Sequence, residues 1–120
     1  MEIFRFDQGV GKKVTHFQSD FVMSRIIKTE NPAQISCMHL EAKGLIGLHE
    51  ATVSQLLLIV EGEGWVRSNG SSLINVKKGQ AVYWDQGENH ETGTETGMTA
   101  IVIESECLSP RDFMAIRDEG

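Results

Sequence analysis

The chain has 120 residues, of which 40% are hydrophobic and 23% charged, and its formal net charge at pH 7 is −6. These values are typical of a soluble globular protein, and the length predicts a single domain over residues 1–120. The basic residues are scattered, which excludes the clustered Lys and Arg that nucleic-acid binding requires. The longest apolar run, Leu56–Val60, is too short to cross a bilayer, and the N-terminus lacks a signal-peptide pattern. We therefore expect a cytoplasmic protein that binds no membrane.

The two cysteines, Cys37 and Cys107, lack the spacing of a metal-binding or redox motif. A disulfide between them is not expected in a reducing compartment. We expect both to be buried apolar side chains that stay reduced and react slowly with thiol reagents.

Short segments rich in β-branched and large apolar residues alternate with turn signals along the chain. They predict strands over residues 21–27, 34–41, 52–60, 65–67, 73–76, 80–84 and 98–104. The apolar run in 52–60 is typical of a strand buried on both faces. Gly44 and Gly47 bracket a predicted loop, and Glu61–Gly64 predicts a corner. Asn69–Gly70 predicts a type I′ hairpin turn, because both central residues of that turn need positive φ.

One segment near the C-terminus has helical features. Ser109 is a candidate N-cap, Pro110 stands at the first helical position, and Asp112 lies in the first turn. Phe113 and Ile116 follow at helical spacing, so a short helix is predicted. The rest of the pattern predicts an all-β antiparallel sandwich or barrel of roughly eight to eleven strands.

Two segments, residues 44–62 and 79–94, resemble the two signature motifs of the cupin superfamily. The positions that match are His49, Gly62, Gly79, Gly87 and His90. The resemblance covers about Met38 to Val102. It implies a cupin-type double-stranded β-helix, which is a jelly-roll barrel.

Several motif positions differ from the family pattern. Ala51 stands where the family has its second histidine, and Gln55 where it has a glutamate. Asp85 replaces a proline and Thr94 an asparagine, and Gly44 is one residue closer to the histidine than the pattern asks. In members with intact motifs, three His and one Glu hold Fe, Mn, Ni, Cu or Zn. The donors left here are His49, His90 and the Gln55 amide oxygen, so we expect any divalent transition metal (Zn, Ni, Fe or Mn) to be held weakly.

Side chains alternate between the faces of a strand, so residues 49, 51 and 55 share one face and residues 90, 92 and 94 another. The resemblance implies that these faces point into the barrel. The predicted ligand pocket consists of His49, Gln55, Tyr83, His90 and Thr92. Two points stay open: whether His39 or Glu41 supplies a further metal ligand, and whether the Gln55 amide is instead hydrogen-bonded to Tyr83 or to the backbone.

The leading hypothesis is a weakly catalytic or non-catalytic cupin that binds a small molecule in its barrel. The alternative is a metal-dependent oxygenase or isomerase that uses His49 and His90. A third hypothesis is a regulatory module that binds a protein partner. The resemblance also implies a homodimer, since the open sheet edges of such a barrel need to be covered.

Overall fold

The computed structural model describes residues 1–117, and nearly all of its regular structure is β-strand. Within these residues the strands are β1 (Glu2–Arg5), β2 (Lys12–Val14), β3 (Phe21–Met23), β4 (Ala33–Leu40), β5 (Leu45–Glu50), β6 (Gln55–Ser68), β7 (Ile74–Lys77), β8 (Gln80–Trp84), β9 (Asn89–Gly93), β10 (Met98–Ser105) and β11 (Ala115–Ile116). Three single turns of 3₁₀ helix are η1 (Gln8–Val10), η2 (His16–Gln18) and η3 (Pro110–Asp112). The all-β prediction is confirmed. No helix in the described part of the chain is long and apolar enough to span a membrane.

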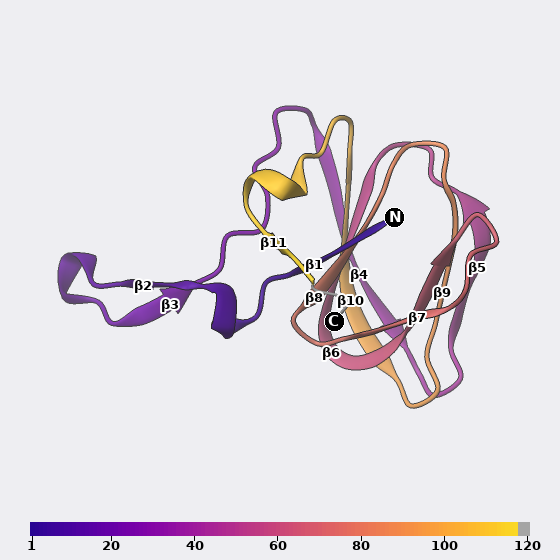
Figure 1. The fold of residues 1–120 in the computed structure, drawn as a ribbon, viewed down its shortest axis with the longest axis horizontal. Coiled ribbons are helices and arrows are strands. Elements are labelled where there is room, and N and C mark those ends of the chain that lie inside the picture. Colours follow the sequence, from indigo (N-terminus) through magenta and orange to yellow (C-terminus); the bar gives the residue numbers. More distant parts are fainter. Residues whose placement is uncertain (118–120) are drawn as a thin grey trace.

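The strands form a barrel of two sheet layers that share the long strand β6 (Figure 1). One layer has the order β11-β1-β8-β6-β10-β4, and its neighbours are antiparallel. In the second layer, β7 and β9 pair with the C-terminal half of β6, and β5 pairs with β9. The N-terminal half of β6 pairs with β8 and β10, so this strand passes from one layer to the other.

The change of layer falls at the predicted corner Glu61–Gly64. A register shift lies opposite this segment on β10, and Gly62 has φ of +81°. The backbone of Gly64 passes so close to Gly93 that a Cβ at residue 64 would overlap the Gly93 carbonyl oxygen. Glycine is therefore required where β6 begins to pair with β9.

Two apolar clusters stabilise the barrel. The inner cluster lies between the layers and includes Leu57, Ile59, Val66, Val76, Val82, Trp84 and Val102. The outer cluster covers the other face of the first layer and includes Phe4, Leu56, Leu58, Ile103, Leu108 and Met114. Alternate residues of the run Leu56–Ile59 enter the two clusters, and this confirms that β6 is buried on both faces.

Several predicted elements are confirmed and others are wrong. Strand β8 spans the predicted residues, and Asn69 and Gly70 both have positive φ, as a type I′ turn requires. The predicted loop between Gly44 and Gly47 is instead part of strand β5. The predicted C-terminal helix is only the turn η3, after which the chain extends and pairs with β1 as β11.

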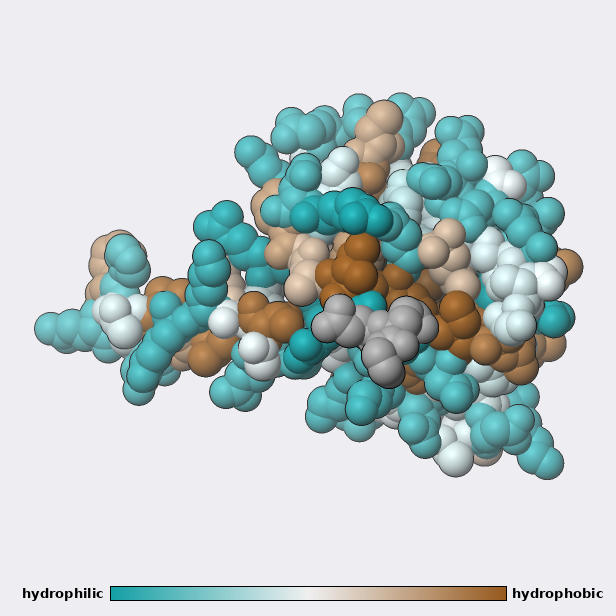
Figure 2. All heavy atoms as spheres, viewed as in Figure 1, coloured by the Kyte–Doolittle hydropathy of each residue, from teal (hydrophilic) through white to brown (hydrophobic). Residues whose placement is uncertain are grey.

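Strands β2 and β3 form a hairpin that projects from the barrel, at the left of Figure 1. We call residues Gly11–Ser24 the arm. Hydrophobic and hydrophilic side chains are interspersed along it in the space-filling view (Figure 2).

Candidate functional site

His49 and His90 face each other on the neighbouring strands β5 and β9. Their ring centroids are 4.3 Å apart, and the ring planes are inclined by 52°. His49 is exposed, and its Nδ1 lies 2.8 Å from the carbonyl oxygen of Gly47. A carbonyl oxygen only accepts, so this contact assigns the proton to Nδ1 of His49. His90 is only 4% exposed.

Trp84 contacts His90 from the end of β8. The two ring centroids are 4.4 Å apart with the planes at 32°, so aromatic rings from both layers meet inside the barrel. Trp84 Nε1 and His90 Nε2 are buried and have no hydrogen-bond partner within residues 1–117. A buried polar group without a partner costs about 1–3 kcal/mol, so these two atoms are an exception to the usual pairing of buried polar groups.

The charge state of His90 follows from its surroundings. The pKa of His90 is lowered to about 4, mainly by burial and also by the nearby His49, while the negative charge of Glu88 acts in the opposite direction. The imidazole is therefore neutral at pH 7.

Glu88 lies in a hydrogen-bonded corner next to this strand. Burial acts to raise the pKa of Glu88, but the hydroxyl of Ser68, the N–H of Asp85 and the amine of Met1 donate to its carboxylate, and the net shift is downward. The carboxylate is therefore ionised at neutral pH and stays ionised to a lower pH than an ordinary glutamate.

The structure buries three more residues of the predicted inward-facing positions. Thr92 is buried and pairs with Val66, which belongs to the inner cluster. Gln55 is buried opposite Trp84, and its amide nitrogen donates to Glu104 Oε1 at 3.1 Å. The amide nitrogen thus donates to a carboxylate and not to Tyr83 or the backbone. Ala51 is also buried, at 1% exposure.

Tyr83 does not join this group, so its predicted place in the pocket is wrong. It precedes Trp84 on β8, and consecutive side chains point to opposite faces of a strand. Tyr83 packs on the outer cluster, and its hydroxyl donates to Asp85 Oδ1 at 2.8 Å. Burial, together with the hydrogen bond to Asp85, raises the pKa of Tyr83 to about 12.

The two open candidates for a further metal ligand lie outside the barrel. His39 is exposed on β4, and its neighbours Met38 and Leu40 are the residues that pack on the inner cluster. Glu41 follows the strand and is exposed.

The donors present do not make a complete metal site. Within the described residues, no group of three or more His, Cys, Asp or Glu side chains is placed to hold a metal ion. Two imidazoles remain, and Gln55 contributes a neutral amide that is already bonded to Glu104. Three protein ligands are the usual minimum for a catalytic metal.

The predicted pocket included neither Trp84, which was expected to be core or pocket wall, nor Glu104. The alternation of side chains along β10 could have identified Glu104, because it points to the same face of the strand as Ala100 and Val102 of the inner cluster. For Trp84, the signal was its position next to Tyr83 on a strand that had been predicted correctly.

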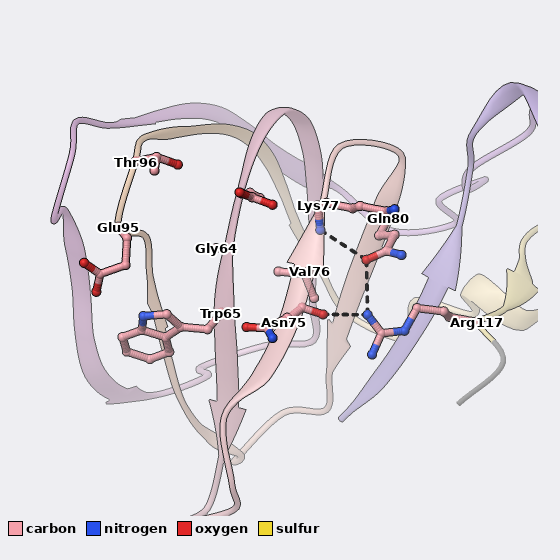
Figure 3. A pocket seen from close by; sticks show the side chains of 10 residues that line it. Gly64, Trp65, Asn75, Val76, Lys77, Gln80, Glu95, Thr96 and Arg117 are labelled. Carbon is pink, nitrogen blue, oxygen red and sulfur yellow. Dashed lines mark hydrogen bonds between the residues drawn. The ribbon is translucent and has the colours of Figure 1, made fainter. Parts of the chain in front are cut away.

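A separate hollow of about 460 Å³ lies on the outer side of the β6–β7 hairpin and includes none of the predicted site residues (Figure 3). Arg117 reaches into it and donates to the Asn75 carbonyl oxygen at 2.6 Å and to Gln80 Oε1 at 3.1 Å. Lys77 and Glu95 also line the hollow. Cations and carboxylates are mixed here, so the charge favours no single class of ligand.

The described fold is similar to several solved structures, some of them named as cupins. A cupin superfamily protein from Desulfitobacterium hafniense aligns with a TM-score of 0.59 and 15% identity over 67% of this chain and 72% of that one. An RmlC-like cupin from Shewanella frigidimarina aligns with a TM-score of 0.59 and 19% identity over 66% and 70% of the two chains. A predicted oxalate decarboxylase from Thermotoga maritima aligns with a TM-score of 0.54 and 25% identity over 61% and 65%.

These alignments, together with the shared strand β6 and the two layers, show that the chain has the cupin fold. Comparisons of the sequence with protein-family models and with curated proteins gave no match. The fold therefore rests on structural similarity, and function has to be argued from the site.

Proposed function

We propose that the barrel interior beside His49, Trp84 and His90 binds a small molecule, and that the protein is weakly catalytic or non-catalytic. The proposal rests on the two buried polar atoms, Trp84 Nε1 and His90 Nε2, that lack a partner within residues 1–117. About nine buried polar groups in ten are hydrogen-bonded, so two orphaned atoms on rings in contact favour a partner from outside the chain.

The donor chemistry limits the ligand class. An indole N–H only donates, and a neutral imidazole nitrogen donates or accepts according to its tautomer. A ligand oxygen, in a hydroxyl, carbonyl or carboxylate group, satisfies Trp84 Nε1 and can also pair with His90. The inner cluster supplies apolar walls, so the rest of the ligand is expected to be apolar.

The pKa of His90, about 4, favours binding over catalysis. A general base works best when its pKa lies near the working pH, and His90 is about 3 units below pH 7. The metal-dependent alternative needs a further donor beside the two histidines. We expect Zn or Ni to bind weakly to His49 and His90 and to be removed by brief dialysis against a chelator. Tight stoichiometric metal in the purified protein would favour the enzyme alternative.

The binding proposal can be tested with Trp84 as its own reporter. The chain has two tryptophans, so Trp65→Phe leaves Trp84 as the single indole. A panel of small carboxylic acids, hydroxy acids and sugars is titrated into this variant while the indole N–H resonance of Trp84 is followed by NMR. We expect at least one class to shift this resonance with saturation, and His90→Ala to abolish the shift.

Two results would contradict the proposal. One is a panel that leaves the Trp84 indole resonance unchanged while the resonance shows the slow exchange of an N–H bonded to internal water. The other is binding that shifts Trp65 in the unmodified protein and leaves Trp84 unaffected, which would place the ligand in the outer hollow.

We also infer that the protein works in the cytoplasm, since its two cysteines are free thiols.

A further inference from the structure

A second cleft, with a basic lining, adjoins the outer hollow. It has a volume of about 530 Å³ and shares Lys77, Gln80 and Arg117 with the hollow. Its other lining residues are Arg5, Asp7 and Lys78, and we call it the basic cleft. Among residues 1–117, it collects four cations against one carboxylate, although the whole chain has a net charge of −6. A local excess of positive charge on an acidic protein favours an anionic ligand at this place.

The cations of the basic cleft come from three parts of the chain that the fold brings together. Arg5 ends β1, and Arg117 follows β11. Lys77 and Lys78 lie at the turn between β7 and β8. Strand β1 pairs with both β8 and β11, which places these parts side by side. The basic residues are scattered in the sequence, so this cluster forms only in the folded chain.

The backbone around the two lysines is held in place. Gly79, which follows them, has φ of +89°, and it packs so closely on Asp7 that an added Cβ would overlap the Asp7 side chain. The side-chain oxygen of Gln80 accepts from the backbone N–H of Lys77 at 3.1 Å and from the Arg117 guanidinium at 3.1 Å (Figure 3). A turn fixed in this way loses little conformational freedom when a ligand binds.

The opposite end of the hollow offers an aromatic surface. Trp65 lies there, with Asn75 between it and Arg117 (Figure 3). The indole is only partly buried, and it lies against the backbone of Gly93, which fixes its position. Glu95, two residues after Gly93, lines the same hollow. An indole packs well on a flat ring such as a nucleobase, and a carboxylate accepts hydrogen bonds from hydroxyl or amino groups.

We propose that the hollow and the basic cleft together bind a phosphate monoester of a ring compound, either a sugar phosphate or a nucleoside monophosphate. The phosphate group lies beside Lys77 and Lys78, which donate charge-assisted hydrogen bonds to it, and Arg117 adds positive charge nearby. The ring packs on Trp65, and its hydroxyl or amino groups donate to Glu95. The mixed charge of the hollow suits such a ligand, because only one end of the ligand is anionic. This site is separate from the one proposed in the barrel interior.

The unmodified protein is titrated with ribose 5-phosphate, AMP, ribose, adenosine and inorganic phosphate. Calorimetry gives the affinities, and NMR follows the indole N–H resonances of Trp65 and Trp84, which Trp65→Phe assigns. We expect at least one monophosphate to bind at least about 10-fold more tightly than its unphosphorylated parent or inorganic phosphate, because both ends of the ligand are held. It should shift the Trp65 resonance and leave that of Trp84 unchanged. Tighter binding of ribose 5-phosphate identifies a sugar-phosphate site, and tighter binding of AMP identifies a nucleotide site.

Variants separate the two ends of the site. Lys77→Ala with Lys78→Ala should weaken both the monophosphate and inorganic phosphate at least about 10-fold, because two cations are lost. The matched control is Lys12→Ala with Lys13→Ala, which removes the same charge from the arm and should leave both affinities nearly unchanged. Trp65→Leu should weaken the monophosphate and leave inorganic phosphate unaffected, since it removes only the aromatic ring. Raising the NaCl concentration from about 0.05 to about 0.5 M should weaken both ligands.

Several results would overturn the proposal. One is a protein that binds neither monophosphate at millimolar concentration. Another is binding that the Lys77 and Lys78 variant and its control weaken equally, because the cations would then act only through the total charge. Monophosphate binding that Trp65→Leu leaves unchanged would remove the ring from the hollow. A monophosphate that shifts Trp84 and leaves Trp65 unaffected would place the ligand inside the barrel.

Discussion

At the residue scale, the contact between Trp84 and His90 combines two effects that oppose each other. Ring contact across the layers adds packing of about 0.5–1.5 kcal/mol, while an unpartnered buried N–H or ring nitrogen costs about as much or more. Burial also keeps His90 uncharged at pH 7, because its pKa falls to about 4. A site that is well packed but lacks polar partners gains most from a ligand that supplies them.

The cysteines give a first prediction. Cys37 and Cys107 are both exposed, so the sequence-based expectation of buried thiols is wrong. At micromolar concentration both should react fully with a disulfide reagent in the folded protein at neutral pH, within about 10-fold of the rate in denaturant, because exposure leaves the thiolate accessible. The release of two chromophores per chain in the native state checks this. Cys37→Ser should remove one of them, and slow labelling of the variant would contradict the exposure of Cys107.

A second prediction concerns the missing metal ligands. Ala51 and Gln55 are buried and stand at the family's ligand positions, so Ala51→His with Gln55→Glu should raise Zn affinity by about 100-fold or more, since ligand number and charge both increase. Calorimetric titration of Zn into both apo-proteins measures the change. His90→Ala added to the double variant should reverse most of it.

Ala51 is fully buried, so its replacement by histidine needs local repacking, and Gln55→Glu alone is a smaller test. That change sets a second carboxylate beside Glu104, which destabilises the apo-protein, and Zn should then raise its melting temperature. If neither variant binds Zn better than the unmodified chain, residues 51 and 55 do not converge on the two histidines.

Part of the site could be predicted from sequence. The motif spacing gave His49, His90, Thr92 and Gln55, because strand alternation is a local rule. The rule failed for Cys37, since both faces of that segment carry apolar residues and neither is marked as the outside. The prediction for Tyr83 failed for a different reason. The sequence does not show which face of β8 points into the barrel, so it does not decide whether Tyr83 or Trp84 lines the interior.

At the element scale, β6 and β9 approach each other closely where they pair. Gly64 lies against the Gly93 backbone, and the Trp65 ring covers Gly93 so closely that a Cβ there would overlap the indole. Gly64→Ala should therefore destabilise the fold by about 2 kcal/mol or more, since backbone is less able than a side chain to move aside.

The matched control is Gly47→Ala. Gly47 lies in β5, and an added Cβ would meet no atom within 4 Å. Urea unfolding should show a lower midpoint for the Gly64 variant and a change within about 0.5 kcal/mol for the control. Equal stability of the two variants would mean that β6 and β9 move apart near Gly64 at little cost.

The elements were predicted best where a strand has a strong local pattern. Asn69–Gly70 and β8 were both assigned correctly, because turn chemistry and β-branched residues act locally. The C-terminal segment failed because Pro110 starts only one turn, Ser109 makes no side-chain cap, and pairing with β1 then outweighs helical propensity. The pairing partner lies more than a hundred residues away in the sequence, so no local pattern reports it.

At the scale of the whole molecule, the buried His90 and the ionised Glu88 determine how the fold responds to acid. The pKa of His90 falls from 6.5 to about 4 on folding, mainly through burial, so between these pH values the unfolded chain binds a proton that the folded chain does not. The free energy of unfolding should therefore decrease as the pH is lowered from 6.5 toward 4. The carboxylate of Glu88 has a pKa below its ordinary 4.5, so its contribution is present above pH 4.5 and is lost as the pH falls further.

The last prediction follows from these two ranges. His90 alone should account for about 2 kcal/mol of the stability lost between pH 6.5 and 4, a value reduced from the full shift because the neighbouring His49 is exposed to water. Urea unfolding at pH 7, 6, 5 and 4.5 measures the slope. His90→Gln removes the titrating group and keeps a polar side chain, so its stability should change little between pH 6.5 and 5, while Glu88→Gln should keep that slope and lose stability at every pH above 4.5. A His90→Gln variant with the unchanged slope would show that a different group controls the acid response, and the burial of His90 beside Trp84 would then carry no proton linkage.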